Sequence, residues 1–453
     1  RIPYERPSRA KKRKAMTITE PQQSYASHPN VEGVCRLLKD NSVRHLYCGG
    51  LYASAASLFS SVLVQRATCP LVFILGDMEE AGYFYHDLTQ ILGTEQVLFF
   101  PSSFRRAIKY GQKDAANEIL RTEVLSRLQK GEEGLCVVTY PDALAEKVVS
   151  RKELGENTLK LHAGERVDMN FVTDVLRSYG FEYVDYVYEP GQYAVRGSII
   201  DVFSFSSEYP FRIDFFGDEV ESVRTFEVET QLSKEKKESI VIVPDLSHSL
   251  EKKGSGGMVS FLDFLPSDSL LAMRDFLWLR ERIQTVHDES LTPQAIAARE
   301  SEENGAITLE GKLIDGGEFT LRALDFRRME FGNKPTGTPD ATVSFHTTVQ
   351  PIFHKNFDMV AESFREYLSR HYTIYICSDS LKQTDRIRAI FEDRGDNISF
   401  TAVERTLHEG FADDTLRICV FTDHQLFDRF HKYNLKSDKA RSGKAVSYTH
   451  LTL

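Results

Sequence analysis

The chain has 453 residues, of which 41% are hydrophobic and 27% charged, and its formal net charge is −10. This composition is typical of a soluble globular protein with two to four domains, and no apolar run approaches the roughly 18 residues that a membrane-spanning helix needs. The six cysteines are scattered without the spacing of zinc ligands, so we expect buried free thiols in a reducing cytoplasm and no metal site.

Both ends differ from the rest of the chain. Residues 1–15 hold seven basic side chains and one acidic, directly before Met16, and residues 446–453, VSYTHLTL, resemble a translated sequencing adapter. We expect residues 1–15 to be upstream read-through and both ends to be disordered, although a basic run can also bind nucleic acid. Without residues 1–15 the chain has 49 basic and 65 acidic side chains, a formal net charge of −16. Such a body is a poor standalone DNA binder, because non-specific affinity comes from lysine and arginine.

Residues 16–150 predict a parallel α/β domain. Nearly continuous apolar strands alternate with helices, a pattern typical of a parallel sheet covered on both faces. The strands are predicted over 43–50, 70–77, 96–101 and 133–144. The helices are predicted over 54–66, 78–93 and 114–131, with Gly93 ending the second one.

The turn after the first strand is the candidate nucleotide site. A phosphate-binding loop reads G-x-x-x-x-G-K-[ST]: its backbone N–H groups wrap the phosphates, its lysine neutralises them and its hydroxyl holds magnesium. Gly50 and Ser57 keep the outer positions, but Ala55 and Ala56 stand at the second glycine and the lysine. We therefore expect a degenerate, non-functional loop, no catalytic residues and no cofactor for this chain.

Residues 151–245 predict a small α+β domain. An amphipathic helix is expected over 167–180, with Phe171, Val175, Leu176 and Tyr179 on one face. Three strands follow, and the last two should be joined by a two-residue hairpin loop at Gly217 and Asp218.

The remaining residues predict two further segments. Residues 246–348 should complete the first domain, with a strand over 258–266 and a helix over 269–286 that places Trp278 in the core. Residues 349–432 alternate helix and strand again, which predicts a second small α/β domain. Within it, Ser378–Ser380 is expected to cap a helix rather than to catalyse. Residues 433–445 are basic and polar and are expected to be a linker.

The stretch from Glu189 to Ser233 carries the clearest motif. It reads R-G-x-x-I-D-V-F, then R-I-D-F-F-x-D-E, then S-V-R-x-F. This pattern resembles the domain-2 signature shared by the excinuclease component UvrB and the bacterial transcription-repair coupling factors. UvrB should have an intact phosphate loop and a tyrosine-rich hairpin, so the degenerate loop and the FFPSSFRRAIKYG region (99–111) favour the coupling factors. The resemblance covers about residues 17–445, the N-terminal third of such a protein.

The resemblance implies an α/β multidomain fold: a degenerate P-loop-like domain (16–150, completed by 246–348), an inserted α+β domain 2 (151–245) and a second small α/β domain (349–432). It implies a non-catalytic fragment that recruits the excinuclease component UvrA during transcription-coupled nucleotide excision repair. The full-length family protein is a DNA translocase that uses ATP and magnesium to displace RNA polymerase. Polymerase and double-stranded DNA would be bound by that full-length protein, whose polymerase-binding domain and motor follow Lys444.

The resemblance also implies where UvrA binds. Arg196 and Phe203 are the first candidates for the contact, with Tyr193 and Arg212 as weaker ones. Counted along one strand, Arg196 and Phe203 have opposite parity, so a bulge is needed to place both on one face. Asp201 is expected to be a buried hydrogen-bond acceptor. Two other interpretations stay open, an active repair ATPase closer to UvrB and a structural shield that covers the motor and is autoinhibitory.

Overall fold

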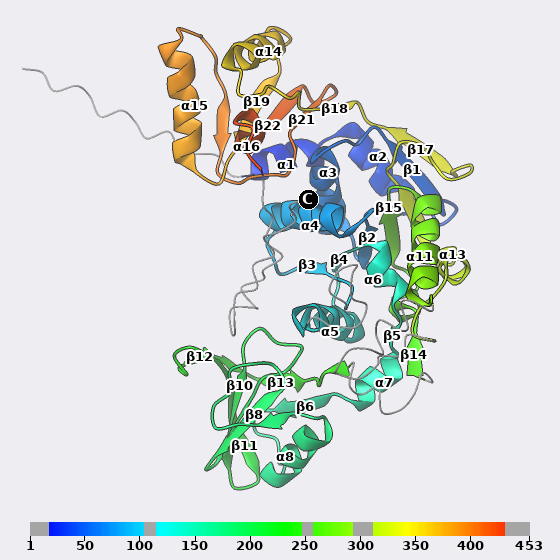
Figure 1. The fold of residues 1–453 in the computed structure, drawn as a ribbon, viewed down its shortest axis with the longest axis vertical. Helices are drawn as coiled ribbons and strands as arrows, with labels where there is room; N and C mark the ends of the chain where they lie inside the picture. The colour runs from blue at the N-terminus through cyan, green and yellow to red at the C-terminus, as the bar shows by residue number, and fades with distance from the viewer. Residues whose placement is uncertain (1–17, 104–114, 247–256, 293–310, 431–453) are drawn as a thin grey trace, which may run out of the picture. The chain divides into compact units, whose positions relative to one another are not determined.

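The computed structural model describes residues 18–103, 115–246, 257–292 and 311–430 (Figure 1). They divide into two compact units. Within the described residues, the first unit comprises 18–35, 50–62 and 344–430, and the second comprises the others. None of the described helices has the length and apolarity needed to cross a bilayer. The expectations for residues 1–15, 433–445 and 446–453 lie outside the described residues.

The second unit contains a seven-stranded sheet, and the parallel α/β prediction is confirmed. From β1 to β3 the neighbouring strands run parallel, in the order β17–β1–β16–β15–β2–β4–β3. The central strands are buried along their whole length, as expected for a sheet covered on both faces. The strands are β1 (His45–Gly49), β2 (Leu71–Ile74), β3 (Val97–Phe99), β4 (Cys136–Thr139), β15 (Leu270–Met273), β16 (Arg327–Glu330) and β17 (Ala341–Ser344).

The predicted helices of this region form close to their expected bounds. Asp77 caps α4 by accepting a hydrogen bond from the Glu80 N–H, and the helix ends at Gly93, whose φ of 82° suits glycine. The helices of the second unit include α4 (Met78–Leu92), α5 (Ala115–Lys130), α6 (Pro141–Ala145), α7 (Arg151–Glu156) and α13 (Gly316–Ala323), and α3 (Ala55–Arg66) begins in the first unit.

Two predictions for residues 258–286 are wrong. The expected strand over 258–266 is the two-residue β14 (Met258–Val259), paired with β5 (Val148–Val149), followed by the short helix α10 (Phe261–Phe264). The expected helix over 269–286 begins with strand β15, and α11 (Phe276–Ser290) starts only after its cap, Asp275. A short apolar run such as LLAM fits a buried strand and a buried helix equally well, so periodicity does not separate them. Trp278 is 44% exposed, which contradicts its expected place in the core.

Domain 2, also in the second unit, is a six-stranded sheet with one helix against it. The strands lie in the order β12–β11–β10–β9–β8–β7, and β6 pairs with β13 beside them. Val172 and Leu176 of the helix α8 (Met169–Ser178) are buried against the sheet, whereas Phe171 is exposed, so the predicted helical face is only partly right. Gly217 and Asp218 join β10 to β11, which confirms the hairpin. The strands are β6 (Leu159–His162), β7 (Glu182–Tyr183), β8 (Gln192–Arg196), β9 (Ile199–Val202), β10 (Phe211–Phe216), β11 (Glu219–Phe226), β12 (Ser233–Lys237) and β13 (Ser239–Ile242).

The first unit contains a smaller five-stranded sheet with helices. The α/β class predicted for residues 349–432 is therefore confirmed. The five strands of this sheet lie in the order β18–β21–β22–β19–β20. Ser380 is the N-cap of α15, but its side chain makes no capping bond; instead the Ser378 hydroxyl accepts the Ser380 N–H. The strands are β18 (Thr347–Val349), β19 (Thr373–Cys377), β20 (Thr401–Val403), β21 (Phe411–Asp413) and β22 (Ile418–Thr422). The helices of this unit include α14 (Phe357–Ser369), α15 (Leu381–Asp393), α16 (Asp423–Leu426) and the N-terminal α1 (Thr19–Ala26) and α2 (Pro29–Leu37).

A buried polar contact joins the N-terminal helices to β21. The Tyr25 hydroxyl donates to Asp413 at 2.9 Å, and the other oxygen of that carboxylate accepts the N–H groups of Thr415 and Leu416. Burial raises the pKa of Tyr25 well above its ordinary value, and the charge and hydrogen bond of Asp413 raise it further. The contact therefore requires a protonated tyrosine.

We predict that this contact makes the first unit sensitive to alkali. A pKa that is raised in the folded state gives stability that is present below the unfolded value, about 10, and is lost as the pH rises above it. Tyr25→Phe should lower the free energy of unfolding by about 1–2 kcal/mol at pH 8. The difference in the free energy of unfolding between parent and variant should become smaller above pH 10, because only the parent then loses the stability that Tyr25 contributes. Denaturant unfolding at both pH values measures it, and a gap that is the same at both would contradict the assignment.

Candidate functional site

The hairpin of β8 and β9, with the next strand β10, brings two of the predicted contact residues, Arg196 and Arg212, onto one face of the domain-2 sheet. Ala194 lies opposite Asp201, and Asp201 lies opposite Arg212 on the next strand. Directly opposed residues of antiparallel strands point to the same side, so Arg196, Asp201 and Arg212 share a face. The parity expectation that separated Arg196 from Phe203 is wrong, because the turn after Arg196 ends one strand and starts another.

We call this surface the arginine face and define it as Arg196, Asp201, Arg212, Asp214 and Arg224. Arg196 pairs with Asp201, and Arg224 pairs with Asp214. Arg212 donates two parallel hydrogen bonds to Asp201, from Nε to Oδ1 at 2.7 Å and from Nη2 to Oδ2 at 2.8 Å. Three guanidinium groups and two carboxylates leave the arginine face with one net positive charge on an acidic chain.

The three arginines differ in the number of their contacts within the chain and in the exposure of their side chains. Arg212 also donates to the Gln231 carbonyl and lies 4.4 Å from the centre of the Phe226 ring, and only 14% of its side chain is exposed. Its hydrogen bonds with Asp201 raise the pKa of Arg212, so it stays charged. The Arg196 and Arg224 side chains are 35% and 37% exposed. These two arginines can therefore still meet a partner.

The predicted aromatic contacts lie in the interior. Tyr193 and Phe203 are both 1% exposed. The Tyr193 ring belongs to the core under α8, and its hydroxyl accepts a hydrogen bond from Arg177. Phe203 packs with Val187, Ala194 and Phe226 in a small separate cluster. In this conformation neither ring is available to a partner.

Sequence reasoning missed exposed aromatic rings of domain 2, among them Phe216 and Tyr186. Phe216, at the end of β10, is 79% exposed, while its neighbour Phe215 is buried. Tyr186 is half exposed, and the Arg196 guanidinium lies 5.1 Å from the centre of its ring. Successive strand residues point to opposite faces, so the pair Phe215–Phe216 already signalled that one of the two rings points away from the core.

The segment from Gly50 to Ser57, the candidate nucleotide loop, lies in the first unit, and protein oxygens accept hydrogen bonds from its backbone. The Tyr52 N–H donates to the Thr347 hydroxyl at 3.0 Å, and that hydroxyl donates to the Gly50 carbonyl at 2.6 Å. The Ser54 N–H donates to the Glu409 carbonyl, and the Glu409 N–H donates back to the Ser54 hydroxyl. N–H groups that precede a helix commonly bind phosphate oxygens. Here protein oxygens accept two of them.

The substituted positions of the loop are buried. Ala55, Ala56 and Ser57 are each at most 2% exposed. A lysine at position 56 would place a charge at a buried position, which is costly without a partner. The small side chains of Ala55 and Ala56 therefore suit a packed loop.

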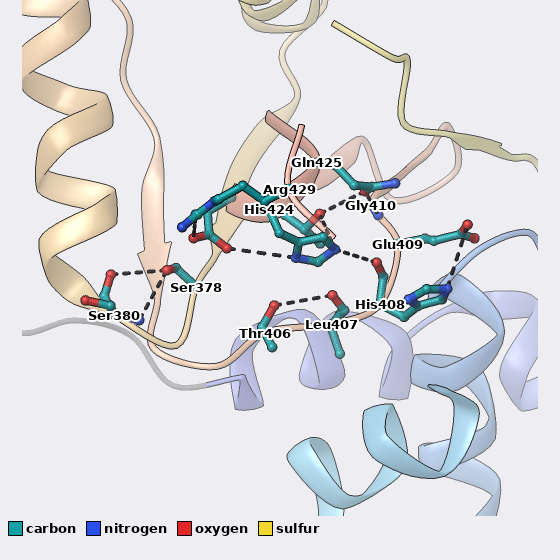
Figure 2. A network of polar contacts seen from close by, with 12 residues as sticks. Ser378, Ser380, Thr406, Leu407, His408, Glu409, Gly410, His424, Gln425 and Arg429 are labelled. Atoms are coloured by element: carbon teal, nitrogen blue, oxygen red, sulfur yellow. Dashed lines mark hydrogen bonds and ion pairs between the residues drawn. The ribbon is translucent and has the colours of Figure 1, made fainter. Parts of the chain in front are cut away.

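A polar network holds the chain segment 406–410 that closes this loop (Figure 2). His424 donates its Nε2–H to the His408 carbonyl at 2.8 Å, and Gln425 accepts the Gly410 N–H at 2.7 Å. Burial lowers the pKa of His424, which keeps the ring neutral. The network lies at the carboxyl ends of β19 and β22, where open α/β sheets commonly bind ligands. In this chain its hydrogen bonds fix a loop.

Gly50 tests how tightly the loop is closed. Its φ is +77°, and a Cβ at this position would lie 2.0 Å from the Phe345 carbonyl oxygen. Gly395, in the same unit, has a φ of +70° and open space around its Cβ position. Gly395→Ala should cost about 1–2 kcal/mol for the left-handed backbone alone, and Gly50→Ala should cost clearly more. Thermal unfolding followed by circular dichroism measures both, and equal losses would show that the loop is not packed against Phe345.

Comparison with known proteins agrees with this geometry. Residues 159–248 match the family described as the UvrB interaction domain. The chain is 21% identical to the transcription-repair-coupling factor of Bacillus subtilis (strain 168), a match that covers 89% of this chain and 40% of that protein. It is 22% identical to the transcription-repair-coupling factor of Staphylococcus aureus (strain bovine RF122 / ET3-1), a match that covers 89% of this chain and 40% of that protein.

The transcription-repair-coupling factor of Escherichia coli (strain K12) is 29% identical over a shorter match, 43% of this chain and 17% of that protein. The chain thus spans no more than two fifths of the length of these relatives. The arginine face lies wholly inside the matched domain. Residues 159–248 thus match the UvrB interaction domain, in a chain that is similar to part of the transcription-repair-coupling factors.

Proposed function

We propose that this chain is a non-catalytic docking module, which recruits the excinuclease component UvrA during transcription-coupled nucleotide excision repair. The observation that carries the proposal is the arginine face, which lies within a UvrB interaction domain. Arg196 and Phe216 are its central contacts. The related coupling factors act in the same process, and recruitment of UvrA through domain 2 is what the family resemblance implies.

The chemistry of the face supports a protein partner with acidic groups. Interfaces concentrate their binding energy in a few arginine and aromatic side chains. The arginine face offers the first kind, and the exposed rings of Phe216 and Tyr186 in the same domain offer the second. A carboxylate of the partner could pair with Arg196 or Arg224, and an apolar pocket could take the exposed Phe216 ring.

We further propose that this chain works without ATP or magnesium. Support comes from the loop after β1, where oxygens of Thr347 and Glu409 accept loop N–H groups and Ala56 replaces the lysine. In this proposal, other parts of a full-length coupling factor bind ATP, RNA polymerase and double-stranded DNA. The proposed location is the cytoplasm. Phe203 and Tyr193 would support the face from within rather than touch the partner.

We predict that Arg196→Ala weakens the complex with purified UvrA by about 30-fold or more, because losing an interface arginine typically costs about 2 kcal/mol. The parent chain should bind without nucleotide or polymerase. The melting temperature should change little, because Arg212 still holds Asp201. Titration by biolayer interferometry measures the affinity.

Arg177→Ala is the matched control. Arg177 is also an exposed domain-2 arginine paired with an aspartate, but it lies on α8, against the other face of the sheet. Arg177 also donates to the Tyr193 hydroxyl, so the melting temperature is measured beside the affinity. A folded Arg177→Ala chain should bind UvrA like the parent. Absence of binding by the parent chain would overturn the recruitment proposal. Normal binding by a folded Arg196→Ala chain would overturn only the role of this residue.

We also predict that the chain neither hydrolyses ATP nor binds it with micromolar affinity. The loop lacks the lysine that compensates phosphate charge, and its Tyr52 and Ser54 N–H groups are already bonded. Isothermal titration with ATP and magnesium, together with a phosphate-release assay, measures this. Turnover that disappears in a Ser57→Ala chain would instead support an active ATPase closer to UvrB.

A further inference from the structure

Asp201 places one buried carboxylate between two guanidinium groups of the arginine face. It is 1% exposed, although it stands on a strand whose neighbours on that side carry Arg196 and Arg212. A buried carboxylate is retained only when charged or polar partners compensate its lost hydration. Both oxygens are used here, Oδ1 by Arg212 and Oδ2 by both arginines.

The two arginines use this carboxylate differently. Arg212 has two bonds to Asp201, a third to the Gln231 carbonyl and an aromatic ring beneath it, so it would keep its place without Arg196. Arg196 is joined to Asp201 by one N–H, and its other described contact is the Tyr186 ring. A guanidinium has five N–H donors. Most of the Arg196 donors therefore stay free to bind a partner.

We propose that Asp201 is a positioning residue for partner binding: it fixes the Arg196 guanidinium between its own carboxylate and the Tyr186 ring before the partner arrives. The inference rests on the proposed docking of UvrA and adds a residue that the partner does not touch. A free arginine side chain loses up to about 2 kcal/mol of conformational freedom when it is immobilised. In this arrangement much of that loss occurs during folding, so it does not weaken the complex.

Charge favours the same arrangement. Asp201 neutralises one of the two guanidinium groups, so the pair can lie close together and still present one positive charge to an acidic partner. Without the carboxylate the two guanidinium groups would repel each other, and the more exposed Arg196, with the fewer contacts, would swing into solvent. A positioning role therefore predicts that the effect of Asp201 on binding passes through Arg196.

A double-mutant cycle tests this dependence. The full chain is prepared as parent, Asp201→Asn, Arg196→Ala and the double variant, and affinity for purified UvrA and melting temperature are measured for each. Asparagine keeps the shape and one oxygen acceptor but removes the charge. We expect Asp201→Asn to weaken binding about 5- to 10-fold in the parent and less than about 2-fold in the Arg196→Ala background, because coupled residues are not additive.

The control cycle replaces Asp201→Asn with Asp214→Asn. Asp214 pairs with Arg224 on the same face and makes no described contact with Arg196. Its effect should be the same in both backgrounds. If Asp201→Asn lowers the melting temperature too far for a binding measurement, Asp201→Glu keeps the charge while moving the carboxylate by one methylene, and the same cycle is run with it.

The outcomes separate the inference from the function on which it rests. Absence of binding by the parent chain overturns the docking proposal and this inference together. Binding by the parent, with equal losses from Asp201→Asn in both backgrounds, shows that Asp201 only holds the sheet and overturns the inference alone. A loss confined to the chain that retains Arg196 supports it.

Discussion

The hydrogen bonds of β15 and β16 are the constraint on which the second unit depends. These strands lie between β1 and β2, although more than a hundred residues separate them from β4 in the chain. Every N–H and C=O of a buried sheet needs a partner, so one edge of β1 and one edge of β2 stay unpaired until residues 270–330 return. The chain between β4 and β15 must leave the sheet and come back to it. Domain 2 occupies that excursion, and its separate apolar core lets it fold as an insertion.

The same rule of satisfied backbone groups explains the nucleotide loop. N–H groups at the start of a helix after a parallel strand need acceptors, and a bound phosphate is one solution. In this chain a hydroxyl on β18 and a carbonyl next to β21 are another. The alanine at position 56 and the closed loop fit the same arrangement, and the His424 network holds the closing segment in place.

Side-chain alternation along the strands gives the domain-2 sheet one apolar face and one polar face. On one side of each strand, apolar side chains pack against α8. On the other side, arginines and aspartates form pairs, and a buried carboxylate sets the geometry of the exposed Arg196. Since both sets stand on the same four strands, the rigid core also fixes the polar face. If the face docks a partner as proposed, it needs little rearrangement when that partner arrives.

The sequence by itself determined the strand–helix alternation of the first domain, the hairpin at Gly217, the second small α/β domain and the degenerate loop at Ala55 and Ala56. These features depend on local periodicity and on turn residues, which neighbours in the chain specify. The domain-2 motif also pointed to Arg196, Arg212 and the buried Asp201.

Only the tertiary structure decided which of the motif's side chains reach solvent. Phe203 is covered by residues from other strands and loops, whereas Phe216 has no such cover, and a strand pattern does not state what packs over each face. The run LLAM became a strand because β2 and β16 offered unpaired edges on either side. Thr347 and Glu409 closed the loop from about 300 residues away or more. Each of these outcomes depends on contacts between distant segments, which local propensity does not encode.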